Sequence, residues 1–170
     1  MNVTPPDYRI GNGHDIHRLY PNHELWLGGI LIDSAKAGFK THSDGDVLSH
    51  AIVDALAGAI ADGDLGTHFP EDDPLAENAR SIEFVREFMH IIHQRGYEIE
   101  NIDSFITLGT TRLQPYVSKI ARELAIAIGI DRSRVSVKAR SNDGIGPEGR
   151  GEAASATVTI LLRRSQTDNS

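Results

Sequence analysis

Residues 41–61 read THSDGDVLSHAIVDALAGAIA. From Val47 to Ala59 the apolar residues recur three or four positions apart, which predicts an amphipathic helix over residues 46–61. The ten residues 41–50 hold two histidines, two aspartates, hydroxyl side chains and a glycine. So much polar chemistry at the start of an apolar helix indicates a site, and the rest of the chain is interpreted around it.

Strands and helices follow in both directions from this helix. Residues 8–19 predict a strand that Gly11 and Gly13 interrupt, and residues 24–33 predict two short strands that turn at Gly28 and Gly29. Helical periodicity returns over 79–96 and 114–129, and alternating strand patterns run over 99–109, 134–141 and 152–162. This order predicts an α+β fold, an α/β sandwich in which helices pack on one face of a mixed sheet. The other face would need cover, which favours self-association.

Composition narrows the class of protein. The chain has 170 residues, which predicts one domain over 1–170, with frayed tails at 1–7 and 163–170. A formal net charge of −7 argues against nucleic acid as the main partner. No apolar run approaches a membrane span, and the short N-terminus carries no signal pattern, which favours the bacterial cytoplasm. There is no cysteine, so a metal would have to bind His, Asp or Glu.

A first group of candidate ligands joins the strand to the helix. Asp15 and His17 are two apart on a strand and therefore share a face, while His50 lies one turn into the helix. If Asp15, Asp44 and Asp46 converged, two charges about 4 Å apart would repel by roughly 4 kcal/mol, which a divalent cation would offset. Three Asp and His ligands with one open position are typical of catalytic zinc. The alternatives are an exposed polar strand, a helix N-cap at Asp46 and a structural histidine.

Two glycine-rich segments are further candidates. Residues 63–74 place Asp64 between glycines, where a carboxylate could hold sugar hydroxyls, although an ordinary loop has the same composition. Residues 141–154 space Ser141, Asp143 and Arg150 among four glycines. Hydroxyl, arginine and backbone N–H groups suit phosphate oxygens, and Asp143 could hold a hard cation such as Mg²⁺. A flexible surface hairpin is the alternative here.

Five motifs together resemble the 2-C-methyl-D-erythritol 2,4-cyclodiphosphate synthase family of non-mevalonate isoprenoid biosynthesis. They are GNGHDIHRL, HSDGDVLSHAIVDALAGA, GDLGTHFPEDDP, NID and GRGE, and they extend the resemblance from about Arg9 to Leu162. The resemblance implies a homotrimer with its sheets facing inward and its active sites between subunits. It implies conversion of 4-diphosphocytidyl-2-C-methyl-D-erythritol 2-phosphate to the 2,4-cyclodiphosphate with release of CMP.

The same resemblance assigns roles to individual residues. It implies that Asp15, His17 and His50 bind zinc and that Asp143 binds a second cation, Mg²⁺ or Mn²⁺. Catalytic roles fall on His42, Ser141 and Asp143. Substrate binding falls on Ser43, Asp64, Gly66, Leu108, Thr111, Arg112, Leu113, Gln114 and Ser141, of which those from Leu108 to Gln114 form the loop whose backbone would contact cytosine. Arg150 joins the predicted substrate-binding residues on its own chemistry, since its guanidinium suits phosphate oxygens.

The chain departs from the family pattern at four places. Thr111-Arg112 replaces Pro-Lys, Asp143 replaces Glu, Pro147 replaces an aromatic residue, and Arg80 replaces an acidic residue before Ser81. The altered loop leaves open a metal-dependent phosphohydrolase that admits water. A non-catalytic trimer that binds phosphorylated ligands or isoprenoids is a further alternative, which an intact zinc triad disfavours.

Overall fold

The computed structural model describes residues 7–70 and 79–165. A five-stranded sheet runs in the order β4-β1-β7-β5-β6, and a separate two-stranded hairpin pairs β2 with β3. The pairings β1–β4, β1–β7 and β5–β7 are antiparallel and β5–β6 is parallel, so the sheet is mixed as predicted. The strands are β1 (Tyr8–Pro21), β2 (Trp26–Leu27), β3 (Ile30–Leu31), β4 (Ala37–Phe39), β5 (Tyr97–Thr107), β6 (Val135–Arg140) and β7 (Ala153–Arg164).

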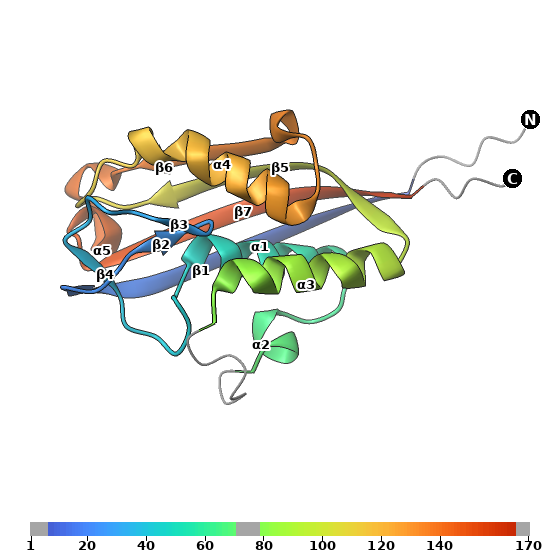
Figure 1. The fold of residues 1–170 in the computed structure, drawn as a ribbon, viewed down its shortest axis with the longest axis horizontal. Coiled ribbons are helices and arrows are strands. Elements are labelled where there is room, and N and C mark those ends of the chain that lie inside the picture. The colour runs from blue at the N-terminus through green and yellow to red at the C-terminus, as the bar shows by residue number, and fades with distance from the viewer. Residues whose placement is uncertain (1–6, 71–78, 166–170) are drawn as a thin grey trace, which may run out of the picture.

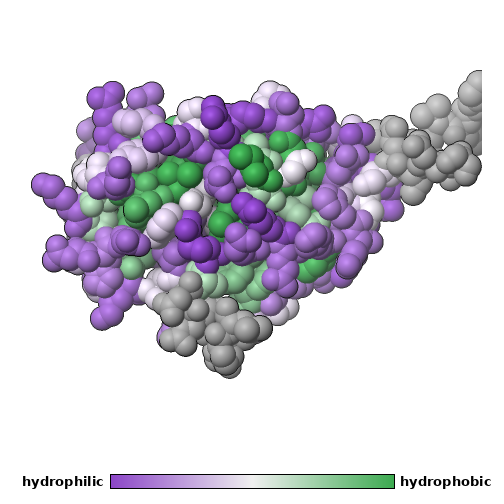
Figure 2. Space-filling model, viewed as in Figure 1, coloured by the Kyte–Doolittle hydropathy of each residue, from purple (hydrophilic) through white to green (hydrophobic). Residues whose placement is uncertain are grey.

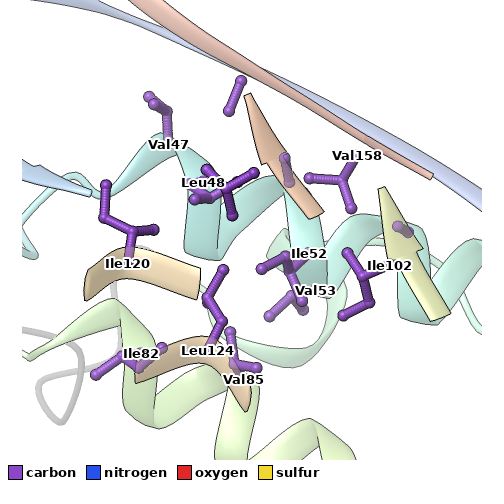
Figure 3. Packing of buried hydrophobic residues seen from close by; sticks show 14 of the residues in the cluster. Val47, Leu48, Ile52, Val53, Ile82, Val85, Ile102, Ile120, Leu124 and Val158 are labelled. Carbon is purple, nitrogen blue, oxygen red and sulfur yellow. The ribbon is translucent and has the colours of Figure 1, made fainter. Parts of the chain in front are cut away.

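Three long helices cover one face of the sheet (Figure 1). They are α1 (Val47–Ala59), α3 (Ser81–Gln94) and α4 (Gln114–Ile128). Their apolar faces meet the strands in one core, in which Leu48 and Ile52 of α1 lie beside Val158 of β7 (Figure 3). Two short helices, α2 (Leu65–His68) and α5 (Gly146–Gly149), lie in the connections. The α+β prediction is confirmed, and β4 and the two short helices are elements that periodicity did not predict.

Glycines bring α1 unusually close to β1. A Cβ atom at Gly11 would lie 1.7 Å from the carbonyl oxygen of Ala55, and one at Gly13 would lie 1.9 Å from that of Ala51. Both glycines are buried within a continuous β1. The prediction that they interrupt the strand was therefore wrong. They instead leave room for the helix backbone, and this close approach sets the distance between side chains of β1 and α1.

Within the described part of the chain, no helix covers the opposite face of the sheet. Ile10 and Ile16 of β1 are 71% and 43% exposed, whereas Gly11 and Gly13, which face the helices from the same strand, are buried. Polar side-chain pairs occupy much of the rest of this face, including His14 with Thr157 (3.0 Å) and Lys138 with Asp103 (2.6 Å). The helical side, seen in Figure 2, shows hydrophilic side chains bordering smaller hydrophobic areas.

Three residues that were predicted to lie in frayed tails, Asp7, Arg163 and Arg164, are instead fixed by the sheet or by hydrogen bonds. Arg163 and Arg164 belong to β7, and Arg164 and Tyr97 both donate to the carboxylate of Asp7, at 2.9 and 3.1 Å. Residues 1–6 and 166–170 of the predicted tails, and residues 71–74 of the glycine-rich segment 63–74, lie outside the described residues. Among the helices that are described, none combines the length and the hydrophobicity that crossing a bilayer requires.

Candidate metal centre

Asp15, His17 and His50 come together at the contact between β1 and α1. One carboxylate oxygen and one nitrogen from each ring lie within 4.8 Å of one another. Oδ2 of Asp15 is 3.0 Å from Nδ1 of His50 and 3.4 Å from Nε2 of His17. Alternation along β1 directs Asp15 and His17 to the helix side, and the glycine contact brings His50 within reach. The predicted metal-capable triad is therefore present.

The protein orients both imidazole rings from behind. Nδ1 of His17 lies 2.9 Å from the carbonyl oxygen of Gly45, and Nε2 of His50 lies 2.9 Å from Oγ of Ser81. Each contact occupies one ring nitrogen and leaves the other directed at Asp15. Hydrogen bonds of this kind fix the tautomer and the angle of histidines that bind metals.

Gly45 has a conformation that only glycine adopts easily. Its φ is +68°, and a Cβ there would lie 2.7 Å from both Phe39 and Thr41. This turn presents the carbonyl that holds His17, which explains why the motif needs a glycine between Asp44 and Asp46.

Burial and charge act in opposite directions on the triad. Burial by itself would raise the pKa of Asp15, but the hydrogen bond from His50 and the positive charges of His17 and His50 lower it. Burial would lower the pKa of His50, but the bond to Asp15 and the negative charges of Asp15, Asp46 and Asp44 raise it. Both shifts favour a charged hydrogen bond between Asp15 and His50, and a divalent cation bound there would displace its proton.

Asp44 and Asp46 are not members of the metal-capable cluster, which holds Asp15, His17 and His50. Asp46 is fully buried and caps α1, accepting from the backbone N–H groups of Leu48 and Ser49 at 3.1 Å each. Its second oxygen accepts from the hydroxyl of Ser49 and the N–H of Gly29, both at 2.8 Å. Because both of its oxygens accept these hydrogen bonds, Asp46 connects the start of α1 to the β2–β3 hairpin and is not a metal ligand here.

A cavity of about 190 Å³ opens beside the triad. His42 and Ser43 line it together with the triad, as the resemblance implied that they would lie near the substrate. Its other wall is apolar, with Leu65 and the rings of Phe69 and Phe84, which stack 4.6 Å apart at 21°. Sequence reasoning missed these three residues because isolated apolar positions in a loop and a helix give no signal that they line a site.

Asp64 immediately precedes α2 and Gly66 lies in it, and both flank Leu65 of the cavity wall without lining the cavity themselves. Asp64 caps α2, accepting from the N–H and the hydroxyl of Thr67 at 2.9 and 2.7 Å. These bonds, opposed by a smaller effect of burial, lower the pKa of Asp64. Asp54 holds the same segment through the N–H of Leu65 at 2.8 Å, and its pKa is raised by burial and by the charges of Asp15 and Asp64.

The predicted nucleotide loop lines a different cavity, of about 170 Å³. This cavity is lined by Leu108, Thr111, Arg112, Leu113 and Gln114 of the loop, and by Ala139, Arg140 and Ser141 at the end of β6. Ser141 accepts from the N–H of Asp143 at 3.3 Å, and Asp143 is exposed with φ +50°. Arg150 pairs with Glu152 at 2.8 Å. Residues 141–150 fold as a 3₁₀ turn followed by α5, not as the alternative hairpin.

The fold and this site define a class of protein: an α+β domain with a metal-capable Asp-His-His cluster at a strand–helix contact. The sequence profile of the YgbB family matches residues 8–163. A protein of Thermosynechococcus vestitus named 2-C-methyl-D-erythritol 2,4-cyclodiphosphate synthase is 44% identical over 155 residues, which are 91% of this chain and 96% of the relative.

Solved structures give the same answer. The structure titled "IspF (Plasmodium falciparum) CDP complex" is 30% identical with a TM-score of 0.82, over 96% of this chain and all of the other. The bifunctional IspDF of Campylobacter jejuni is 31% identical with a TM-score of 0.88, over 94% of this chain and 43% of that longer one. The chain belongs to the YgbB family, as its motifs indicated.

Proposed function

We propose that this protein converts 4-diphosphocytidyl-2-C-methyl-D-erythritol 2-phosphate to 2-C-methyl-D-erythritol 2,4-cyclodiphosphate and CMP. Family membership supports the reaction, since the relative from Thermosynechococcus vestitus carries the name of this synthase. The observation that carries the proposal is the Asp15–His17–His50 cluster, which opens into a cavity also lined by His42 and Ser43.

The donors fit zinc. Two imidazoles and one carboxylate lie within 4.8 Å of one another, and each ring has its second nitrogen held by the protein. In this proposal Asp15, His17 and His50 hold Zn²⁺, which when bound supplies a Lewis acid for phosphate oxygens. Asp143, through a hard carboxylate oxygen, holds Mg²⁺ or Mn²⁺ near the nucleotide loop.

The reaction needs no nucleophile from the protein. An oxygen of the 2-phosphate attacks the β-phosphorus, a new P–O bond closes the ring, and the bond to the CMP oxygen breaks with its electron pair leaving on CMP. His42 and Ser43 orient the phosphates, and Ser141 and Arg150 contribute donors to their oxygens. Fixing both groups in one pose contributes roughly 7–11 kcal/mol to well-oriented intramolecular reactions.

The apolar wall of the cavity has a specific task in this scheme. Leu65, Phe69 and Phe84 pack around one side of the space that the reacting groups would occupy. Water that reached the β-phosphorus would give an open-chain product, so excluding water favours ring closure. Asp64 and Gly66 bind hydroxyl groups of the substrate at the edge of this wall.

We further infer that the working protein is a homotrimer whose active sites form between subunits. Two features support this: the metal-side residues and the nucleotide-loop residues line separate cavities, and one face of the sheet is uncovered with Ile10 and Ile16 exposed. A neighbouring copy that packs against this face would bring its Leu108–Gln114 loop to the metal side of the first.

The primary experiment is a phosphorus NMR time course with purified protein, substrate, Zn²⁺ and Mg²⁺. Cyclic diphosphate resonances that appear in step with CMP are the expected result. CMP accompanied by an open-chain product would mean that the protein is a phosphohydrolase. No change in the spectrum, with zinc bound, would instead favour a non-catalytic binding protein.

A complementation experiment tests the shared site. Neither a His50→Ala nor an Arg112→Ala assembly should turn over normally, because one lacks a metal ligand and the other a nucleotide contact. Dissociating and reassembling the two together should restore part of the activity, since some interfaces then combine two unmodified halves. Activity that stays at the level of the separate variants would contradict sites shared between subunits.

A further inference from the structure

Arg80 sits at the start of α3, behind the metal-capable triad, and makes three specific contacts. Its Nε donates to Oδ2 of Asp44 at 3.2 Å, and its Nη2 donates to the carbonyl oxygen of Gly29 at 2.8 Å. Its guanidinium carbon lies 3.6 Å from the centroid of the Trp26 ring. The guanidinium therefore connects the β2–β3 hairpin to the loop that precedes α1.

Asp44 links Arg80 to Ser81, which in turn contacts His50 of the triad. Its side chain is only 6% exposed. Its Oδ1 accepts the hydroxyl of Ser81 at 2.5 Å, and both of its oxygens lie 3.2 Å from the N–H of Ser81. Because the hydroxyl donates to Asp44, its oxygen is left to accept from Nε2–H of His50 at 2.9 Å. The route Arg80–Asp44–Ser81–His50 is thus a continuous chain of hydrogen bonds, in which His50 donates to Ser81 while Ser81 and Arg80 both donate to Asp44.

We propose that Arg80 is a positioning residue, which through Asp44 and Ser81 fixes the His50 ring with Nδ1 facing Asp15. The proposal rests on the metal site of the proposed function but not on turnover. The forked guanidinium donates to two acceptors on different segments and stacks on Trp26, and a lysine could not reproduce all three contacts. Without Arg80, Asp44 keeps its bonds from Ser81 and from the N–H of Asp46 at 3.2 Å. It loses the side-chain contact that fixes Oδ2, which loosens the Ser81 hydroxyl and with it the ring.

Electrostatics alone predicts the opposite sign. Arg80 is a positive charge close to a site for a cation, so replacing it with a neutral residue should strengthen cation binding if charge were all that mattered. A positioning role predicts weaker binding. Partners behind metal ligands typically change metal affinity by about 10- to 100-fold, and Arg80 acts two hydrogen bonds further from His50 than Ser81 does. We therefore expect Ser81→Ala to weaken zinc binding by about 10-fold and Arg80→Met by about 3- to 10-fold.

The test is the zinc dissociation constant of the full chain, measured by competition with a chelator. Arg86→Met is the matched control, because Arg86 lies on the same helix and bonds Glu123 at 3.1 Å, away from the triad. Weaker zinc binding in Arg80→Met with an unchanged Arg86→Met supports the proposal. Equal or tighter binding in Arg80→Met overturns it, whether or not the unmodified protein turns over substrate.

A double-mutant cycle tests the route. If Arg80 acts through Ser81, the double variant Arg80→Met/Ser81→Ala binds zinc no more weakly than Ser81→Ala alone. Fully additive losses would overturn the route. Should Arg80→Met fold poorly, Arg80→Lys replaces it in both experiments, with an expected smaller loss of affinity, and wild-type affinity in that variant counts against the forked contact.

A spectroscopic readout follows the ring itself. In the metal-free protein, the Nε2–H proton of His50 is buried and bonded to Ser81, so it should exchange slowly and give a resolved ¹H–¹⁵N imidazole signal. The signal should broaden in Arg80→Met and stay sharp in Arg86→Met. An unchanged signal in Arg80→Met would show that the ring is held without Arg80.

Discussion

A Cβ atom at Gly13 would lie 1.9 Å from the carbonyl oxygen of Ala51, the residue that follows His50. A strand and a helix backbone are thus in direct contact one residue away from a candidate metal ligand. The pair Gly13–Ala51 couples the stability of the domain to the geometry of the triad, because whatever moves α1 from β1 also moves His50 from Asp15.

Gly13→Ala should destabilise the protein. The new methyl group overlaps backbone atoms that cannot rotate away, so the free energy of unfolding should fall by about 3 kcal/mol. Denaturant unfolding measures this. Gly58→Ala is the matched control on α1, where a Cβ meets nothing within 4 Å, and it should raise stability by about 0.5–1 kcal/mol. Equal effects of the two substitutions would show that the contact is not rigid.

Asp46→Ala should also destabilise the protein. The carboxylate is fully buried and accepts four hydrogen bonds, from Leu48, Gly29 and both the N–H and the hydroxyl of Ser49. Losing a cap and leaving buried donors unpaired should lower the free energy of unfolding by about 3 kcal/mol. Asp131→Ala, which removes an exposed cap of the 3₁₀ turn before β6, should lower it by less than about 1 kcal/mol.

His50→Ala should abolish both zinc binding and turnover. Removing one of three ligands leaves a carboxylate and a single imidazole, too few donors for a stable zinc site. Metal content after dialysis and the phosphorus NMR time course measure the two effects. His90→Ala, an exposed histidine of α3, should retain both. Full zinc occupancy in the His50 variant would refute this ligand assignment.

Asp143→Ala should weaken the dependence of turnover on Mg²⁺ or Mn²⁺ and leave zinc content unchanged. Its carboxylate lies in the turn after β6, whereas the zinc ligands lie on β1 and α1. Titrating activity with Mg²⁺ at saturating zinc checks this. Asp143→Glu should keep the dependence on Mg²⁺ or Mn²⁺ that Asp143→Ala weakens, because it retains a carboxylate and introduces the Glu of the family pattern. A titration curve unchanged by Asp143→Ala would remove this residue from the second metal site.

The prediction of the fold from sequence succeeded where local physics determines structure. The apolar period of α1, α3 and α4, the cap at Asp46 and the glycines that end α3 and α4 each act within a few residues of the chain. For that reason the helices lie where their patterns predicted them. The elements that were missed, β4, α2 and α5, are three or four residues long, too short for a period to appear.

The same boundary runs through the site. Asp15 and His17 are recognisable because residues two apart on a strand point to the same face. His50 is recognisable because it lies one turn after the polar start of α1. The sequence by itself determined the three candidate metal ligands and the local elements that present them.

Only the tertiary structure decided how those elements meet. The contact of Gly11 and Gly13 with α1 places His50 against Asp15. The sequence does not reveal that β1 and α1 touch, so this proximity could not be predicted from it. Asp44 was free in sequence terms to join Asp15, but the start of α3 supplies Ser81 and Arg80, which bind it instead. Contacts between segments about 36 residues apart, as Arg80 and Asp44 are, depend on the packing of the whole domain and leave no periodic trace in the chain.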